Sequence, residues 1–177
     1  KKEQTPLAKL SLNGLSFRSV GPSLTAGRIA DIAVNTKNPK IYYVAVASGG
    51  VWKTENSGNT YKPIFDDQGS YSIGCVKIDP NNEHTIWVGT GENNNQRSVA
   101  YGDGVYKSLD GGKSWKNMGL KSSEHIGMIE VDPTNSNKIY VAAYGPLWKE
   151  GGERGRRQIN QYTRYSTVFL ATIQAWG

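Results

Sequence analysis

Hydrophobic and polar residues alternate along three segments of the chain that share one plan. Each segment has an alternating run, a polar turn and a second run, at residues 32–44, 76–88 and 129–141. Alternation at a period of two places successive side chains on opposite faces and is typical of half-buried strands. The turns begin with Asn or Asp, whose side chains can hydrogen-bond their own turn. The pattern therefore predicts a repeated pair of antiparallel strands.

The first two copies continue with a second matched pair of segments. Gly50–Thr54 aligns with Gly104–Ser108, and each segment leads into a Gly-rich turn and an aromatic residue. The offset between copies grows from 44 residues (Ile32 to Val76) to 54 residues (Val51 to Val105). The difference is an insertion of about ten residues, Glu92 to Tyr101. A period of this length with about four short strands per unit predicts the blades of a β-propeller.

The turn after the second copy has a defined pattern of polar, glycine and aromatic residues. An Asp carboxylate there can accept hydrogen bonds from the amides of a tight hairpin, glycine permits a positive φ, and Trp packs beneath the loop. The first copy has Asn56 and Tyr61 in place of the Asp and the Trp, and we interpret both turns as structural. The pattern residues of the second copy are Ser108, Asp110, Gly112, Ser114 and Trp115.

This turn is the Asp-box, and the repeat resembles the BNR/Asp-box propellers, a group that includes sialidases, xyloglucanases and sortilin-type receptors. The runs Thr90–Ser98 and Tyr101–Ser108 resemble, more closely, bacterial secreted proteins called BNR-repeat or sortilin-N-terminal-like glycosyl hydrolases, and Phe17–Pro22 resembles the opening of that group. The resemblance covers roughly residues 15–155. It implies an all-β fold, a partial β-propeller of about three four-stranded antiparallel blades with Asp-box hairpins, near residues 28–65, 72–118 and 125–155.

The ends of the chain depart from the repeat. Residues 1–14 are expected to be an N-terminal extension, and residues 156–177 a basic tail without the strand and Asp-box that a third copy should have. A shifted reading frame, a truncated gene and a divergent ending each account for such a tail. The first residues lack an initiator Met and an apolar leader, so we expect a secreted or periplasmic protein whose leader was removed, or a sequence that begins within its gene.

Three blades cannot close a ring of the usual four to eight, so an open sheet edge is expected. The predicted partners are therefore the remaining blades of a longer parent chain, or a second molecule bound through the open edge. A polysaccharide or an extended peptide is the predicted ligand.

Composition excludes several other classes. The net charge is +6, but Arg156, Arg157 and Arg164 supply half of it, and no basic stripe with interleaved aromatics predicts nucleic-acid binding. No run approaches the roughly 20 apolar residues of a membrane span. The single cysteine, Cys75, rules out an intrachain disulfide and is predicted to be buried and inert. No metal site and no cofactor are predicted, because the two histidines lie 41 residues apart and no calcium or phosphate loop occurs.

Candidate site residues come first from the repeat itself. Arg28, Ser72 and His125 each stand four residues before an aligned strand position, so we expect them to converge on one face of the propeller. Arg28 could bind a carboxylate or sulfate, and His125 could act as a donor or general base. The alternative for His125 is a structural histidine with satisfied hydrogen bonds.

The insertion is the second source of candidates. Side-chain amides donate and accept hydrogen bonds together, which suits sugar hydroxyls or a peptide backbone; the alternative is a solvated loop that folds over a neighbouring blade. Trp148 is a candidate sugar-stacking platform, whereas the other tryptophans are expected to pack. The candidate ligand-binding residues of the insertion are Asn93, Asn94, Asn95, Gln96 and Arg97.

Catalysis is left open by these residues. Glycoside hydrolysis needs two carboxyl groups about 5–9.5 Å apart. The candidate carboxyl groups are those of Asp31, Glu92, Asp103 and Glu124, of which Glu92 and Asp103 are preferred, with His125 as a further catalytic candidate. Asp103 is equally well a turn residue. Ala47 stands where the xyloglucanases have a catalytic Asp, and the sialidase opening is matched only in Phe17 and Arg18. We therefore predict a propeller that binds a polysaccharide and, as a further hypothesis, hydrolyses it. The alternatives are a sortilin-like peptide receptor without catalysis and an assembly scaffold.

Overall fold

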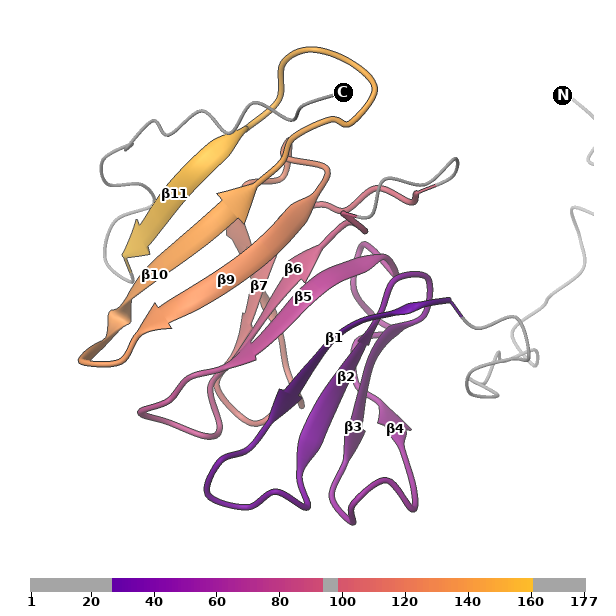
Figure 1. Cartoon of the computed structure of the whole chain (residues 1–177), viewed down its shortest axis with the longest axis vertical. Helices are drawn as coiled ribbons and strands as arrows, with labels where there is room; N and C mark the ends of the chain where they lie inside the picture. The colour runs from indigo at the N-terminus through magenta and orange to yellow at the C-terminus, as the bar shows by residue number, and fades with distance from the viewer. Residues whose placement is uncertain (1–26, 94–98, 161–177) are drawn as a thin grey trace, which may run out of the picture.

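Three antiparallel sheets make up the protein, as a computed structural model describes it for residues 27–93 and 99–160 (Figure 1). The described residues contain strands, turns and bends but no helix. The strands are β1 (Ile29–Val34), β2 (Tyr42–Val46), β3 (Gly50–Thr54), β4 (Lys62–Pro63), β5 (Ile73–Ile78), β6 (Ile86–Thr90), β7 (Val105–Ser108), β8 (Lys116–Gly119), β9 (Ile126–Asp132), β10 (Asn135–Ala143) and β11 (Gly155–Asn160).

Each sheet is a meander of strands that follow one another in the sequence. The first sheet has the order β1-β2-β3-β4 and the second β5-β6-β7-β8, while the third has β9-β10-β11 within the described residues. Figure 1 shows the second sheet between the other two, with β1, β5 and β9 as neighbouring inner strands. The predicted all-β architecture is confirmed. The third sheet includes residues 156–160 as part of β11, which lie beyond the expected boundary at 155.

The three copies share their first turn in atomic detail. Asn35 accepts a hydrogen bond from the Lys37 amide at 2.9 Å, and Asp79 accepts one from the Asn81 amide at 2.8 Å. Asp132 does the same for the Thr134 amide at 2.9 Å. A side-chain oxygen that binds the amide two residues later closes the turn locally. The polar residue that ends each first run therefore sets the reversal into the second strand.

The start of each inner strand is also equivalent between copies. The carbonyl oxygens of Arg28, Ser72 and His125 each accept a backbone hydrogen bond from the residue just after the second strand, at 2.8, 2.7 and 2.9 Å. The donors are the amides of Ala47, Gly91 and Tyr144. The sequence alignment of these positions thus corresponds to the same place in each sheet.

Packing between the sheets forms the core. Between the first and second sheets, Tyr43, Val51 and Phe65 pack against Ile73 and Val76 in one buried cluster. A second cluster joins the second and third sheets through Trp87, Val105 and Leu120 on one side and Ile129 and Val141 on the other. Full burial of such a side chain stabilises the fold by roughly 1.5–3 kcal/mol. The sheets therefore hold one another in place through their faces.

The turn after β7 binds its own side chains and the neighbouring sheet. Asp110 accepts hydrogen bonds from the amides of Lys113 and Ser114, both at 2.9 Å, and from two serine hydroxyls. These hydrogen bonds, chiefly those from Ser114, hold the pKa of Asp110 well below its ordinary value. Trp115 donates through its indole N–H to the Ile64 carbonyl oxygen at 2.7 Å and so joins the second sheet to the first. In the first copy, Asn56 binds the Thr60 amide at 2.9 Å in the same way.

We expect Asp110→Ala to lower the free energy of unfolding by about 1–2 kcal/mol, because the donors of the turn lose a charged acceptor. The folded state favours the carboxylate, so this stabilisation is present above the ordinary pKa of 3.8 and is lost as the pH falls below it. Urea titrations of both proteins against pH measure the difference. Asp67→Ala, at an exposed turn position, is the control; an equal loss in that variant would contradict the structural role of Asp110.

Candidate functional site

Most of the candidate residues lie at one end of the sheets. There β5 and β9 begin, β6 and β10 end, and the insertion leaves the second sheet (Figure 1). Because antiparallel strands alternate in direction, the ends of the second strands meet the starts of the inner strands at this edge. We call this edge the insertion end of the molecule, defined by residues 70–72, 91–93, 99–103, 122–127 and 144–154.

A partly buried ion pair joins the first two sheets at the insertion end. The Arg28 guanidinium donates to Glu92 through Nε at 2.8 Å and also through a terminal nitrogen. The Glu92 side chain is 1% exposed, whereas that of Arg28 is half exposed. The Glu92 amide donates to the Ser72 hydroxyl at 2.9 Å. Arg28 thus binds a carboxylate of the chain itself, a pairing between residues 64 positions apart that sequence reasoning missed.

His125 lies close to this pair and is fully buried. Its ring packs against Tyr101, with ring centroids 5.6 Å apart. Burial lowers the pKa of His125, and the nearby Glu92 and Glu124 oppose this shift only in part. His125 thus stands at the start of its inner strand, as Arg28 and Ser72 do, but its side chain is enclosed whereas that of Arg28 is half exposed. The imidazole is enclosed, and neither of its ring nitrogens has a hydrogen-bond partner among the described residues, so the structure supports neither a general base nor a histidine with satisfied hydrogen bonds.

Two glycines explain why Glu92 and His125 lie so close. A side chain at Gly91 would place its Cβ 1.9 Å from the Glu124 carbonyl oxygen, and one at Gly74 would lie 2.1 Å from that of Ile126. Gly91 also has a φ of +89°, which other residues rarely adopt. The backbones of the second and third sheets therefore approach closely at this edge, and the residue after Gly91 is directed inward.

Asp103 connects the insertion to the second sheet. Its carboxylate accepts hydrogen bonds from the Thr90 hydroxyl at 3.2 Å and from the Tyr106 hydroxyl, and its amide donates to Thr90 at 2.8 Å. Burial and, secondly, the hydrogen bond to Asp103 raise the pKa of Tyr106. Both carboxylate oxygens are engaged within the sheet, so the turn interpretation of Asp103 is favoured over that of a catalytic acid.

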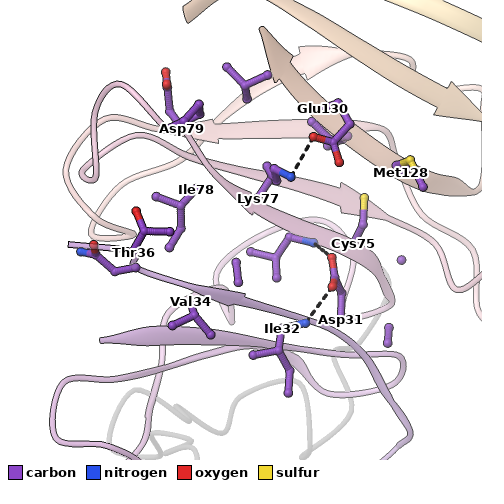
Figure 2. Close-up of a pocket in the computed structure, with 18 of the residues that line it drawn as sticks. Asp31, Ile32, Val34, Thr36, Cys75, Lys77, Ile78, Asp79, Met128 and Glu130 are labelled. Atoms are coloured by element: carbon purple, nitrogen blue, oxygen red, sulfur yellow. Dashed lines mark hydrogen bonds and ion pairs between the residues drawn. The ribbon is translucent and has the colours of Figure 1, made fainter. Parts of the chain in front are cut away.

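A groove runs from the insertion end along the inner strands, with a volume of about 690 Å³ (Figure 2). Asp31 lies in it and accepts a hydrogen bond from the Val76 amide at 3.0 Å, while Lys77 and Glu130 form an ion pair at 2.8 Å across β5 and β9. Asn93 reaches the same groove, and its side-chain amide donates to the Gly127 carbonyl oxygen at 3.2 Å. The first part of the insertion therefore folds over the third sheet.

The candidates Asn94, Asn95, Gln96 and Arg97 lie outside the described residues.

Four aromatic side chains at the insertion end are between 51% and 63% exposed. Trp148 is the predicted one, and the structure adds three tyrosines that sequence reasoning missed. In the sequence, Tyr71 directly precedes Ser72 and Tyr101 lies in the insertion. Their places next to candidate residues could have marked them as candidates too. Hydrogen bonds from Ser70 and Ser72 to the carbonyl oxygens of residues 101 and 100 hold the insertion beside β5. The exposed aromatic residues are Tyr71, Tyr101, Tyr144 and Trp148.

The remaining chemistry of the described residues is limited. Burial raises the pKa of Cys75, which favours the inert thiol. No group of three or more metal-ligating side chains occurs among the described residues. Within residues 27–93 and 99–160, no helix is long and apolar enough to span a membrane.

Comparison with known proteins places the fold. An ancestral GH74 enzyme has a TM-score of 0.59 at 20% identity, and a GH74 enzyme from Niastella koreensis has 0.54 at 22%; they cover 78% and 77% of this chain but only 18% and 20% of their own. An auxiliary nutrient binding protein from Bacteroides thetaiotaomicron has a TM-score of 0.57 at 17% identity, over 84% of this chain and 31% of its own. The fold is therefore a partial β-propeller.

No family model matches the sequence. Among curated proteins, the protein translocase subunit SecY of Rickettsia bellii is 38% identical over 80 residues, which is 42% of this chain and 17% of that protein. The SecY of Pseudomonas aeruginosa is 66% identical over 29 residues, 16% of this chain and 7% of that protein. The chain spans less than a fifth of the length of these relatives.

We expect Arg28→Ala to lower the free energy of unfolding by about 1–3 kcal/mol, because the Glu92 carboxylate would then stay buried without the guanidinium. The double variant Arg28→Met/Glu92→Gln removes both charges and should recover much of the loss. Chemical denaturation of the three proteins measures this. A double variant less stable than Arg28→Ala would contradict a stabilising role for the ion pair between Arg28 and Glu92.

The burial of His125 predicts a pH dependence of stability. Its folded-state pKa is lowered, so the unfolded chain binds the extra proton, and stability is lost as the pH falls below the ordinary value of 6.5. We expect the fall in unfolding free energy from about pH 7.5 to about pH 5.5 to be smaller in His125→Leu than in the native protein. His84→Gln, which replaces the exposed histidine, is the matched control. Denaturant titrations at both pH values measure the slopes, and a native slope in His125→Leu would show that the imidazole is not held neutral.

Proposed function

We propose that this chain is part of a polysaccharide-binding β-propeller whose ligand lies across the insertion end. The observation that carries the proposal is that Tyr71, Tyr101, Tyr144 and Trp148 all lie at this end of the sheets and are each more than half exposed. Exposed apolar surface of this kind, when several residues contribute to it, marks interaction and ligand sites. The apolar faces of sugar rings stack on such side chains, and nearby amides and hydroxyls hydrogen-bond the sugar hydroxyls.

The charges at the insertion end support a ligand held by stacking and hydrogen bonds. Arg28 binds Glu92, and Lys149 binds Glu124 at 2.7 Å. Arg154 donates to the carbonyl oxygens of Gly151, Pro146 and Lys149 and so holds the loop that carries Trp148. These cations bind acceptor groups of the chain itself, whereas the aromatic side chains remain exposed and can contact a ligand.

Binding is proposed ahead of hydrolysis. Of the candidate carboxyl groups, Glu92 is buried against Arg28 and Asp103 is hydrogen-bonded within the second sheet. Asp31 accepts hydrogen bonds from the amides of Ile32 and Val76, and Glu124 forms an ion pair with Lys149. Ala47, where xyloglucanases carry their catalytic Asp, is buried and supplies no acid. The GH74 and nutrient-binding neighbours support a carbohydrate or nutrient ligand by fold alone. Secretion or a periplasmic location is part of the same proposal, since polysaccharides are met outside the cytoplasm.

We expect Trp148→Ala and Tyr101→Ala each to weaken retention on an insoluble polysaccharide by about tenfold, since stacking against one aromatic ring contributes on the order of 1 kcal/mol or more. Affinity electrophoresis and pull-down against a panel of plant and bacterial polysaccharides measure retention, and thermal unfolding confirms that the variants fold. Tyr61→Ala, with a tyrosine exposed at the opposite end of the first sheet, is the matched control.

The alternatives give different results in the same assays. Unchanged retention in both variants would contradict the proposal. Binding of extended peptides without retention on any glycan would favour the sortilin-like receptor or the scaffold. Release of reducing sugar that is lost in Glu92→Gln and kept in Asp110→Asn would establish hydrolysis at the insertion end.

A further inference from the structure

His125 is a buried polar side chain at the insertion end that the proposed ligand surface leaves unexplained. It is fully buried, and neither of its ring nitrogens has a hydrogen-bond partner among the described residues. Because burial removes water from both nitrogens, an imidazole without partners is costly to enclose. Such a residue calls for an explanation beyond packing, since an apolar side chain would avoid this cost.

His125 contacts both segments that carry exposed aromatic residues around it. Its ring packs on Tyr101 of the insertion, with ring centroids 5.6 Å apart. Its backbone carbonyl oxygen accepts a hydrogen bond from the amide of Tyr144 at 2.9 Å, at the start of the loop that leads to Trp148. Both tyrosines are more than half exposed. A change at the imidazole therefore reaches the aromatic surface through direct contacts.

Two acidic residues oppose the effect of burial on this histidine. Burial is the largest influence and lowers the pKa of His125, while Glu92 at the end of β6 and Glu124 before β9 raise it. Each acid already has a cation: Arg28 binds Glu92, and Lys149 binds Glu124 at 2.7 Å. The second carboxylate oxygen of Glu124 is buried without a hydrogen-bond partner in the described part of the chain. Glu124 therefore has an acceptor left for a further donor.

The backbone of Glu124 is held in an unusual conformation. Its φ is +64°, in the left-handed region that favours glycine. Its carbonyl oxygen accepts a hydrogen bond from the Gly102 amide at 2.7 Å, which joins it to the insertion. Strained residues persist where the surrounding structure holds them, and they are frequent at binding and switching sites. Glu124 thus links the insertion, the loop of Lys149 and the residue before the third sheet, His125.

We propose that protonation of His125 releases the loop that carries Trp148 and so weakens ligand binding at the insertion end. A protonated imidazole has two N–H donors and a charge, and in the interior it needs an acceptor from the protein. Glu92 is already bound by a guanidinium, so Glu124 is the acceptor that can turn toward the imidazolium. Glu124 then gives up Lys149, and the loop loses this ion pair.

This inference rests on the proposed function, because the ligand is the polysaccharide proposed there. The proton favours the form with the loop released, and the ligand favours the form with the loop bound. By linkage, each weakens the binding of the other to the same extent. A histidine with a packing role alone would change the stability of the fold with pH but would leave this coupling at zero.

An NMR titration of the full chain tests the coupling without any ligand. Between about pH 7.5 and about pH 5, we expect the Trp148 indole N–H signal to shift with the same midpoint as the His125 ring. Glu124→Gln should lower that midpoint, because the imidazolium loses a counter-charge. Lys149→Met should raise it, because a competing cation is lost. Different midpoints for the two native signals, or an unmoved midpoint in both variants, would overturn the proposal.

Retention on an uncharged polysaccharide, such as xyloglucan or a β-glucan, measures the control of binding. We expect native retention to be at least about threefold weaker at about pH 5 than at about pH 7.5, with folding at both values checked by thermal unfolding. His125→Phe keeps an aromatic ring beside Tyr101 and cannot titrate, so its retention should be nearly equal at the two values. His84→Gln, at the exposed histidine, should keep the native ratio.

The outcomes separate this inference from the proposed function. Native retention that is equal at both pH values, or a native ratio in His125→Phe, would overturn the control by His125. A native protein retained on no polysaccharide at either pH would overturn the proposed function, and the NMR titration would then decide by itself whether His125 is coupled to the loop.

Discussion

Burial of both faces of each sheet is the constraint on which the rest of the structure depends. A sheet of four short strands has too little area to be stable alone, and its two faces here are both apolar. The second sheet satisfies this requirement because Val76 and Ile73 pack on the first sheet and Trp87 and Val105 on the third. In the first sheet the opposite face is also buried along β2 and β3, through Val44, Val46 and Trp52, whereas Ile29 and Ile32 of the inner strand β1 remain exposed.

The close packing of the sheets also determines the chemistry of the insertion end. Glycines at the starts and ends of strands let the backbones of the second and third sheets approach closely, and this brings Glu92 and His125 into the interior. A buried carboxylate requires a charged or hydrogen-bonding partner, which Arg28 of the first sheet supplies. The same ion pair therefore links two sheets and supports the base of the insertion.

In the proposed function, structural support and ligand recognition fall to different residues. Charged residues that sequence reasoning selected for catalysis, Glu92 and Asp103, bind other groups of the chain. The side chains left open to a ligand are aromatic, and they lie on the loops around those engaged groups. This division between a hydrogen-bonded polar base and exposed aromatic rings is the reason for proposing a bound extended ligand rather than proton transfer.

The sequence by itself determined the strands, their turns and their repeat, because alternation, Asx turns and the Ser108–Trp115 pattern act over a few neighbouring residues. It also determined which positions are equivalent, such as Arg28, Ser72 and His125. Only the tertiary structure decided that Arg28 binds Glu92, that His125 is enclosed and that three further tyrosines are exposed beside Trp148. These outcomes depend on contacts between sheets that lie far apart in the sequence, and no local pattern records which side chains such contacts will bury.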